Sequence, residues 1–252
     1  MNAAIQLTGL TKRFGERVAL NAISATIPTG GITGLVGPDG AGKSTLLRLL
    51  AGLLVPEAGE IRVLGLDPVR EGDALRQRLG YMPQQFGLYE DLSVQENLSL
   101  YADLRGVLEP ERTPTLARLL AFTDLARFTA RPAGKLSGGM KQKLGLACAL
   151  LGTPDVLLLD EPGVGVDPIS RRALWQMVRE LAEGGMTVLW STAYLDEAEA
   201  RAGLRPARHP GRAAARRARG RGRSHLPPRP LEDGARAGPG RHDGALEHRL
   251  PR

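Results

Sequence analysis

The sequence predicts an α/β protein with a parallel-stranded core, a small antiparallel β layer at its N-terminus and a block of helices inserted into the core. Three observations predict this class. Short segments with alternating apolar residues recur over residues 5–36. A helical pattern then runs from Leu92 to Leu151, and wholly apolar strands follow at Val156–Leu159 and Met186–Trp190. Strands that are apolar throughout are buried on both faces, as parallel strands are.

The N-terminal part contains four predicted strands. They cover Ile5–Thr8, Val18–Leu20, Ile32–Val36 and Glu60–Leu64, and a Pro-Thr-Gly-Gly turn at 28–31 precedes the third. Between the first two stands Phe14, an aromatic residue that could stack on a flat ring or lie in the core. This part therefore contains the small β layer, and its third strand leads into the core.

A glycine-rich loop follows the third strand and has the pattern G-x-x-x-x-G-K-[ST]. An amphipathic run begins at Leu46, directly after it. Strand, glycine loop and helix together predict a phosphate site in a P-loop NTPase core, because backbone N–H groups and the helix N-terminus face one anion. A plain glycine turn is the alternative, and both flanks argue against it. The loop consists of Gly37, Pro38, Asp39, Gly40, Ala41, Gly42, Lys43, Ser44 and Thr45.

The inserted block has recognisable helix starts. Ser93 and Glu96 form a capping box for a helix that runs through Tyr101, and a second helix is predicted over Thr115–Phe122. Ser137, followed by two glycines, opens a third helix. We expect a helical subdomain over about residues 85–151.

Two acids end the apolar strand at Val156–Leu159. Asp160 and Glu161 would face the crevice where open α/β sheets bind ligands. Neighbouring side chains on a strand point to opposite faces, so the two can share a site only if the strand has ended, as Pro162 suggests. A solvated strand end is the alternative.

The core continues with a helix, a strand and a second helix. Asp167 and Pro168 are an N-cap and N1 pair for the first of these helices. A simple cap is at least as good an explanation of Asp167 as a functional role. Strand Met186–Trp190 follows, and residues 191–199 are predicted to lead into a last helix.

The charge of the chain is divided unevenly. Residues 1–199 carry 20 Lys and Arg against 23 Asp and Glu, whereas residues 200–252 carry 14 Arg against 4 acids. The net charge of +7 therefore comes from the tail. This balance argues against nucleic-acid binding by residues 1–199.

Cysteine content and hydropathy exclude two further classes. The single Cys148 lies in an apolar helical run and is expected to be a buried small hydrophobe, so no disulfide framework is possible. No signal peptide precedes the first strand, and no apolar run reaches the ~18 residues that span a bilayer. We expect any membrane role to come through a partner.

The glycine loop, Gln84, the segment Leu136–Gln142 and the acids of Val156–Pro162 occur in one order and spacing. This arrangement resembles the ATP-binding domain of ABC transporters over residues 5–199. Leu-Ser-Gly-Gly at 136–139 matches the family signature, and Ser137 precedes Asp160 by the 23 residues typical of the family. Segments 87–98 and 163–172 are most similar to the first half of tandem ATP-binding subunits of bacterial efflux systems.

The resemblance implies a role for each motif. Phe14 would stack on adenine, and the loop from Gly37 to Thr45 would be the Walker A loop. Lys43 would reach the β/γ-phosphates, and Ser44, Gln84 and Asp160 would hold Mg²⁺. Gln84 would also sense the membrane partner and contact the attacking water, which Glu161 would deprotonate. The remaining residues act across a head-to-tail dimer: Ser137, Gly138 and Gly139 would bind the γ-phosphate held by the second domain, and Asp167 would lie in the loop at the interface.

Two positions depart from the family pattern. Asp39 stands where Asn is usual, and a carboxylate near phosphates weakens binding unless it points away. Ala193 stands where the family has its switch histidine, and all four histidines (His209, His225, His242 and His248) lie in the tail. The departure at Ala193 predicts impaired turnover.

The tail, residues 200–252, has a different composition. Arg, Ala, Gly and Pro make up 39 of its 53 residues, and it has no aromatic residue. Such a segment is expected to be disordered. These four residues have GC-rich codons, so the composition indicates a frameshift near Ala200. An evolved basic tail that binds anionic lipid or nucleic acid is the rival interpretation.

Three functions are compatible with these features. The first is an ATP-hydrolysing subunit that powers an export permease, located in the cytoplasm at the inner face of the membrane. The second is a regulatory domain that binds ATP and hydrolyses it poorly, as Ala193 suggests. The third is a soluble ABC protein that acts on nucleic acid or ribosomes, which the acidic balance of residues 1–199 disfavours. The exported substrate is not encoded in these motifs.

Overall fold

The computed structural model describes residues 3–85, 87–193 and 205–206. All of them belong to one compact unit, residues 1–212. The elements in chain order are β1 (Ala3–Phe14), β2 (Arg17–Pro28), β3 (Gly31–Val36), α1 (Lys43–Leu50), β4 (Ala58–Val63), α2 (Gly72–Arg78), β5 (Leu79–Met82), α3 (Val94–Leu104), α4 (Arg112–Phe122), η1 (Ala126–Phe128), η2 (Ala133–Lys135), α5 (Gly138–Ala149), β6 (Val156–Leu159), α6 (Pro168–Glu183), β7 (Thr187–Thr192) and β8 (Arg205–Pro206).

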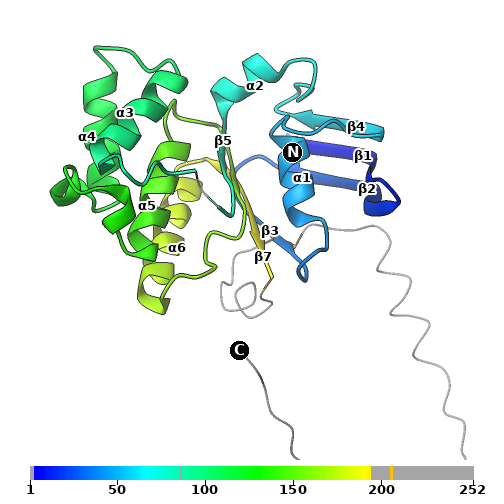
Figure 1. Ribbon diagram of the computed structural model, residues 1–252. Helices are drawn as coiled ribbons and strands as arrows, with labels where there is room; N and C mark the ends of the chain where they lie inside the picture. The colour runs from blue at the N-terminus through cyan, green and yellow to red at the C-terminus, as the bar shows by residue number, and fades with distance from the viewer. Residues whose placement is uncertain (1–2, 86, 194–204, 207–252) are drawn as a thin grey trace, which may run out of the picture. The chain divides into compact units, whose positions relative to one another are not determined.

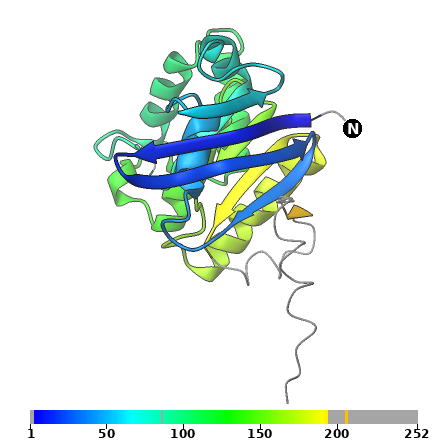
Figure 2. The ribbon, with the colours of Figure 1, turned by 90° about the vertical axis from the view of Figure 1, so that its right-hand side faces the viewer.

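Two sheets organise this unit. A parallel sheet has the order β5-β6-β7-β3-β8, and an antiparallel sheet has the order β2-β1-β4. Figure 1 shows α3, α4, α5 and α6 on one side of the parallel strands and β1, β2 and β4 on the other. In Figure 2 the antiparallel strands lie across the front of the core. The predicted α/β class with its small β layer and inserted helices is confirmed.

The antiparallel layer has longer strands than the sequence pattern predicts. Strands β1 and β2 each have 12 residues. Their register shifts at several points, one of them between Leu7 and Leu10, where Gly9 has a φ of 59°. Each shift breaks the apolar alternation while pairing continues. The alternation therefore marks only parts of these strands.

Helices α3, α5 and α6 begin where their caps predict, and the helix predicted over Thr115–Phe122 begins earlier, at Arg112. The Ser93 side chain accepts from the Glu96 N–H at 3.2 Å, and Glu96 Oε2 accepts from the Ser93 N–H at 2.8 Å, which completes the capping box of α3. Ser137 caps α5 and Asp167 caps α6. Helix α6 packs on the sheet through Trp175, whose ring meets that of Trp190 edge-on at 5.4 Å between centroids.

Several predictions concern the interior and the C-terminal part. Cys148 is buried, as expected, and burial raises the pKa of its thiol above the ordinary range. Among the described residues, no helix is long and apolar enough to cross a bilayer. Arg205 and Pro206 pair with Thr33 and Gly34 of β3. The helix predicted to follow Ser191 falls mainly on 194–199, outside the described residues, and so does almost all of the tail, so both remain predictions.

Candidate functional site

The glycine loop connects β3 to α1 and takes a conformation that requires glycine. Gly42 is the N-cap of α1 and has a φ of 88°. A Cβ on Gly42 would lie 2.5 Å from the carbonyl oxygen of Ala19 on β2. The loop is thus packed against the antiparallel layer, and glycine is required at position 42 for a steric reason as well as a conformational one. The first turn of α1 leaves its N–H groups directed at the space beside the loop.

Lys43, the first residue of α1, folds back over this loop. Its Nζ donates to the carbonyl oxygens of Gly37 at 2.7 Å and Pro38 at 3.0 Å. It also forms an ion pair with Glu161 Oε1 at 2.9 Å. Both side chains are nearly inaccessible, with 6% and 7% of their surface exposed. A buried ammonium therefore holds together the loop and the second acid after β6.

The two acids after β6 point in different directions and still belong to one network. Strand β6 ends at Leu159, and Glu161 has a φ of 49°, a left-handed conformation that is uncommon for a residue with a side chain. Glu161 Oε2 accepts from Gln84 Nε2 at 3.0 Å. Asp160 turns to β7, where its Oδ1 accepts from Ser191 Oγ at 2.8 Å. Because β6 ends before the two acids, both of them can contribute to one site.

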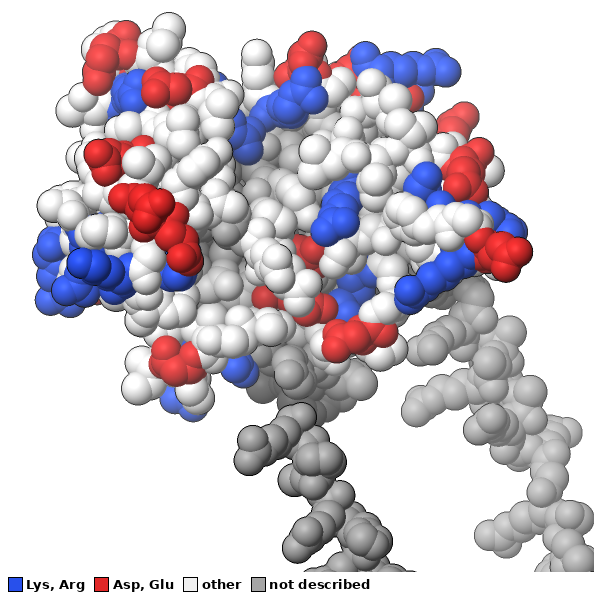
Figure 3. Space-filling view, in the orientation of Figure 1, with Lys and Arg blue, Asp and Glu red and all other residues white. Residues whose placement is uncertain are grey.

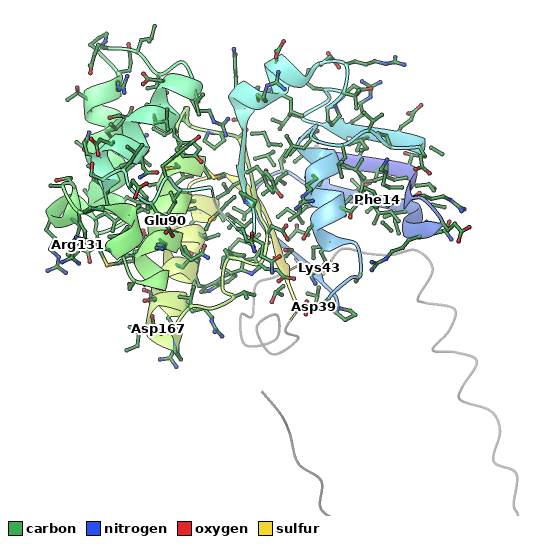
Figure 4. The ribbon with its side chains drawn as sticks, viewed as in Figure 1. Phe14, Asp39, Lys43, Glu90, Arg131 and Asp167 are labelled. Atoms are coloured by element: carbon green, nitrogen blue, oxygen red, sulfur yellow. The ribbon has the colours of Figure 1, made fainter. Side chains whose placement is uncertain are left out.

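A cavity of about 510 Å³ lies beside the loop, and the network forms part of its wall. The predicted site residues Phe14, Ser44 and Gln84 line it together with Lys43 and Glu161. Figure 4 shows Phe14, Asp39 and Lys43 on the same side of the unit. The complete lining described is Phe14, Arg17, Ala19, Asp39, Gly40, Gly42, Lys43, Ser44, Thr45, Gln84, Glu161, Val164 and Ala193.

Phe14 and Arg17 both line this cavity, and the sequence motifs indicate only the first of them. They are paired across the β1–β2 turn, and the Phe14 ring is 50% exposed with Lys12 Nζ 5.4 Å from its centroid. A Cβ on Gly40 would lie 3.3 Å from Arg17 Nη2, so the guanidinium rests on the loop. The sequence could have indicated Arg17, because a two-residue turn between paired strands places residue 17 beside residue 14.

The donors expected for Mg²⁺ are oxygen atoms of suitable type. Ser44 offers a hydroxyl, Gln84 an amide oxygen and Asp160 a carboxylate, which are hard ligands that Mg²⁺ prefers. Ser44 and Gln84 line the cavity, whereas Asp160 is 1% exposed and lies behind it. No cluster of three or more His, Cys, Asp or Glu suited to a metal occurs in the described ranges. These residues fit an ion that takes its remaining ligands from phosphate and water.

Ser137, Gly138 and Gly139 are placed elsewhere. None of them appears in the lining of the nucleotide-sized cavity. Ser137 Oγ accepts from the Met140 N–H at 3.3 Å, so the hydroxyl serves as the N-cap of α5. Gly139 lies against α6, where an added Cβ would stand 2.3 Å from Ser170 Oγ. The single chain does not bring its signature segment to its own glycine loop.

Asp167 lies beside this segment and has a clear structural task. Its Oδ1 accepts from the N–H groups of Ile169 at 3.1 Å and Ser170 at 3.0 Å. The hydrogen bond from the Ser170 backbone, followed by that from its side chain, lowers the pKa of the exposed Asp167 carboxyl. The cap is therefore satisfied within the chain.

A second, larger hollow lies between the helical part and the core. It has a volume of about 1140 Å³ and is lined in part by Leu53, Tyr81, Pro83, Gly87 and Leu104. Leu104 is 70% exposed and Leu53 is 61% exposed. Pro83 and Gly87, which line it, lie on either side of Gln84 in the chain.

Comparison with known proteins gives a consistent result. A sequence model of the ABC transporter family matches residues 20–164. The probable multidrug ABC transporter ATP-binding protein YbhF of Escherichia coli K12 is 66% identical over 200 residues, which cover 79% of this chain and 35% of YbhF. The daunorubicin resistance ATP-binding protein DrrA3 of Streptomyces coeruleorubidus is 41% identical over 198 residues, 79% of this chain and 63% of DrrA3. The chain thus spans about a third of the first relative and under two thirds of the second.

A solved structure has the same fold. It is a dimeric, post-hydrolysis form of the ATP-binding cassette MJ0796 bound to ADP and phosphate. Its TM-score with this chain is 0.69 at 30% identity, over 80% of this chain and 92% of that one.

Proposed function

The chain belongs to the ABC transporter family, and from this premise we propose that it binds ATP with Mg²⁺ and hydrolyses it to drive an export permease. The observation that carries the proposal is the buried contact between Lys43 and Glu161 beneath the glycine loop. It places the cation expected to bind phosphate within 2.9 Å of the acid expected to activate water. Both belong to the wall of one cavity.

Lys43 links nucleotide entry to the release of Glu161. Its ammonium has three donors, and Gly37, Pro38 and Glu161 accept from it here. An entering triphosphate competes for these donors, because a charge-assisted bond to phosphate is at least as strong. Glu161 then loses its cation and keeps its contact with Gln84. The acid becomes free to accept a proton only when phosphate occupies the loop.

The hydrolytic step needs one base and a stabilised leaving group. The oxygen of a water molecule attacks the γ-phosphorus, the bond from that phosphorus to the β–γ bridging oxygen breaks, and the water's proton passes to the Glu161 carboxylate. ADP and phosphate are the products. Lys43 and the N–H groups at the start of α1 stabilise the charge on the phosphate oxygens.

Mg²⁺ would be held by Ser44, Gln84 and Asp160 when nucleotide is bound. The ion supplies charge neutralisation at the phosphates. The protein's part is to present Ser44 and Gln84 at the cavity and to hold Asp160 behind them, fixed by Ser191, where it would act on the ion largely through water.

A second ATP-binding domain completes the site. Ser137 and the two glycines after it lie away from the chain's own cavity. Their capped helix start is a suitable anion site for the γ-phosphate of another copy. The head-to-tail dimer is also compatible with the dimeric neighbour bound to ADP and phosphate.

The proposed membrane partner is a permease subunit that places a short segment in the hollow lined by Leu53 and Leu104. Leu53 and Leu104 are exposed beside the charged Asp73 and Arg76, so the hollow offers both apolar and ionic contacts. Pro83 and Gly87, which flank Gln84 in the chain, line it, so an occupant would contact the segment that carries Gln84. DrrA3 is named for daunorubicin resistance and YbhF for multidrug transport. Leu104→Glu should abolish co-purification with the permease and leave ATP binding intact; unchanged co-purification would exclude this hollow.

Nucleic acid is not part of the proposal. Figure 3 shows Lys and Arg interspersed with Asp and Glu on the face that it draws. A nucleic-acid surface needs a continuous basic stripe.

The experiment that tests the function is a comparison of Glu161→Gln with Glu90→Gln. Both remove one carboxylate charge, and Glu90 is 68% exposed and pairs with Lys141 on α5. Loss of the base should lower the turnover of Glu161→Gln by about 10²–10⁴-fold. Glu161→Gln should also elute as an ATP-bound dimer in sizing chromatography with MgATP. Equal turnover of the two variants would contradict the role of Glu161.

One observation favours the second candidate, a regulatory domain with slow hydrolysis. Ala193 lines the cavity at the position of the family's switch histidine. All four histidines of the chain fall on residues 207–252, outside the described residues. Ala193→His should raise ATP turnover, measured by phosphate release at saturating MgATP. If the wild type already hydrolyses ATP at a substantial rate and Ala193→His does not raise that rate, the first candidate, an ATP-hydrolysing subunit, is favoured.

A further inference from the structure

Ser191 on β7 contacts both acids that follow β6. Its hydroxyl donates to Asp160 Oδ1 at 2.8 Å and accepts from the Glu161 N–H at 2.9 Å. We propose that Ser191 is a positioning residue for MgATP hydrolysis, which fixes the Mg²⁺-binding acid and the acid that activates water through one buried hydroxyl. This inference rests on the proposed function.

The sheet register explains why this residue reaches both acids. Leu159, the last residue of β6, pairs with Trp190 of β7. Strand β7 continues to Thr192, so Ser191 is the first residue of β7 that lies beside the turn after β6. A short polar side chain at this place meets Asp160 and the backbone of Glu161 together.

The hydroxyl uses both sides of its hydrogen-bonding capacity. Its one proton is donated to Asp160. Its oxygen accepts from the backbone N–H of Glu161, the residue in the left-handed conformation. A left-handed residue with a side chain persists only where its surroundings hold it. Lys43 and Gln84 hold the Glu161 carboxylate, and Ser191 holds its backbone.

Ser191 acts through the acids and not on the nucleotide. Its side chain is fully buried, and it is not among the residues that line the cavity. Removing it should therefore leave the glycine loop and Mg²⁺-free ATP binding intact. Outer partners of metal ligands typically contribute 10–100-fold to metal affinity or activity.

The test compares Ser191→Val with Ser191→Thr in the full chain. The two side chains have nearly the same shape, and only Thr keeps the hydroxyl. Ser191→Val should lower kcat about 10–100-fold and remove the increase in ATP affinity that Mg²⁺ produces. Its Mg²⁺-free ATP affinity, measured with a fluorescent ATP analogue, should equal that of the wild type, which also reports that it is folded. Ser191→Thr should restore the Mg²⁺ response.

Thr187→Val is the matched control. Thr187 is on the same strand, is 3% exposed, and its hydroxyl accepts from the Gly30 N–H at 2.9 Å without touching an acid. It should respond to Mg²⁺ as the wild type does. An unchanged Mg²⁺ response in Ser191→Val, or an equal loss in Thr187→Val, would overturn the inference. A wild-type chain that binds no MgATP would instead overturn the proposed function on which it rests.

Discussion

The glycine loop and the signature segment are both helix N-termini, and they differ in what they leave unsatisfied. At the glycine loop, the N-cap Gly42 has no side chain, and the free N–H groups of α1 face a cavity. At the signature segment, the Ser137 side chain caps α5, and Gly139 is pressed against α6. Figure 4 shows Lys43 and Asp167 on different sides of the unit.

Because of this difference, the chain can form one half of the site alone and not the other. Beside the first helix start, Glu161 contacts both a cation, Lys43, and an amide, Gln84. Asp160 is joined to this group only through Ser191, which also accepts from the Glu161 N–H. The second has its contacts within α5 and α6 and presents an exposed serine. The first region is therefore prepared for a charged ligand, and the second is prepared for a surface that another molecule supplies.

The largest expected effect is that of Lys43→Ala on ATP binding. Loss of a charge-assisted contact to phosphate should weaken ATP binding about a hundredfold, measured by calorimetry. The substitution also leaves Glu161 buried without its cation, so the free energy of unfolding should fall by about 3–5 kcal/mol.

The double variant Lys43→Ala/Glu161→Gln separates the two consequences. It removes the unpaired charge, so unfolding stability should largely return while ATP binding stays weak. Lys141→Ala is the control, because Lys141 forms its ion pair on the exposed surface of α5. If Lys43→Ala still bound ATP tightly, the glycine loop would not depend on its cation. The proposed difference between the two helix N-termini would then be wrong.

The motifs predicted much of the first region because its chemistry is local in sequence. Lys43 and Ser44 follow the loop glycines, and the acids follow a strand whose apolar run is unmistakable. The contact of Lys43 with Glu161 joins α1 to the end of β6 and cannot be read from either segment. The same holds for Ser191, whose position depends on the register of β6 against β7.

The second region was predicted as a nucleotide contact, and the structure adds a packing requirement. Neither the motif nor the helical period indicates that Gly139 meets Ser170, since that contact depends on how α5 crosses α6. Similarly, the alternation in β1 and β2 marked only parts of the strands, because register shifts reset the apolar pattern. The Gly139–Ser170 contact and the full length of β1 and β2 therefore depend on packing between segments that are far apart in the sequence.

The smaller expected effect concerns this packing and is measured by urea denaturation of Gly139→Ala. An added Cβ would lie 2.3 Å from Ser170 Oγ and 2.4 Å from Ser170 Cβ. Crowding of this kind typically costs about 1–3 kcal/mol. Alanine favours the helix by about 1 kcal/mol over glycine, so the net loss of unfolding free energy should be about 0–2 kcal/mol. Gly138→Ala is the control, since its Cβ would meet only the Gly165 carbonyl oxygen at 3.3 Å.

Gly139→Ala/Ser170→Gly decides whether Gly139 serves packing alone. The second change removes both crowding atoms, so the unfolding free energy of the double variant should equal that of Ser170→Gly or exceed it by up to about 1 kcal/mol, the helix preference of alanine over glycine. If Gly139 also meets the γ-phosphate of a second copy, ATP-dependent dimerisation should remain impaired in the double variant despite the recovered stability. Recovery of both properties would assign Gly139 to packing, and the signature segment would then act through Ser137 and Gly138.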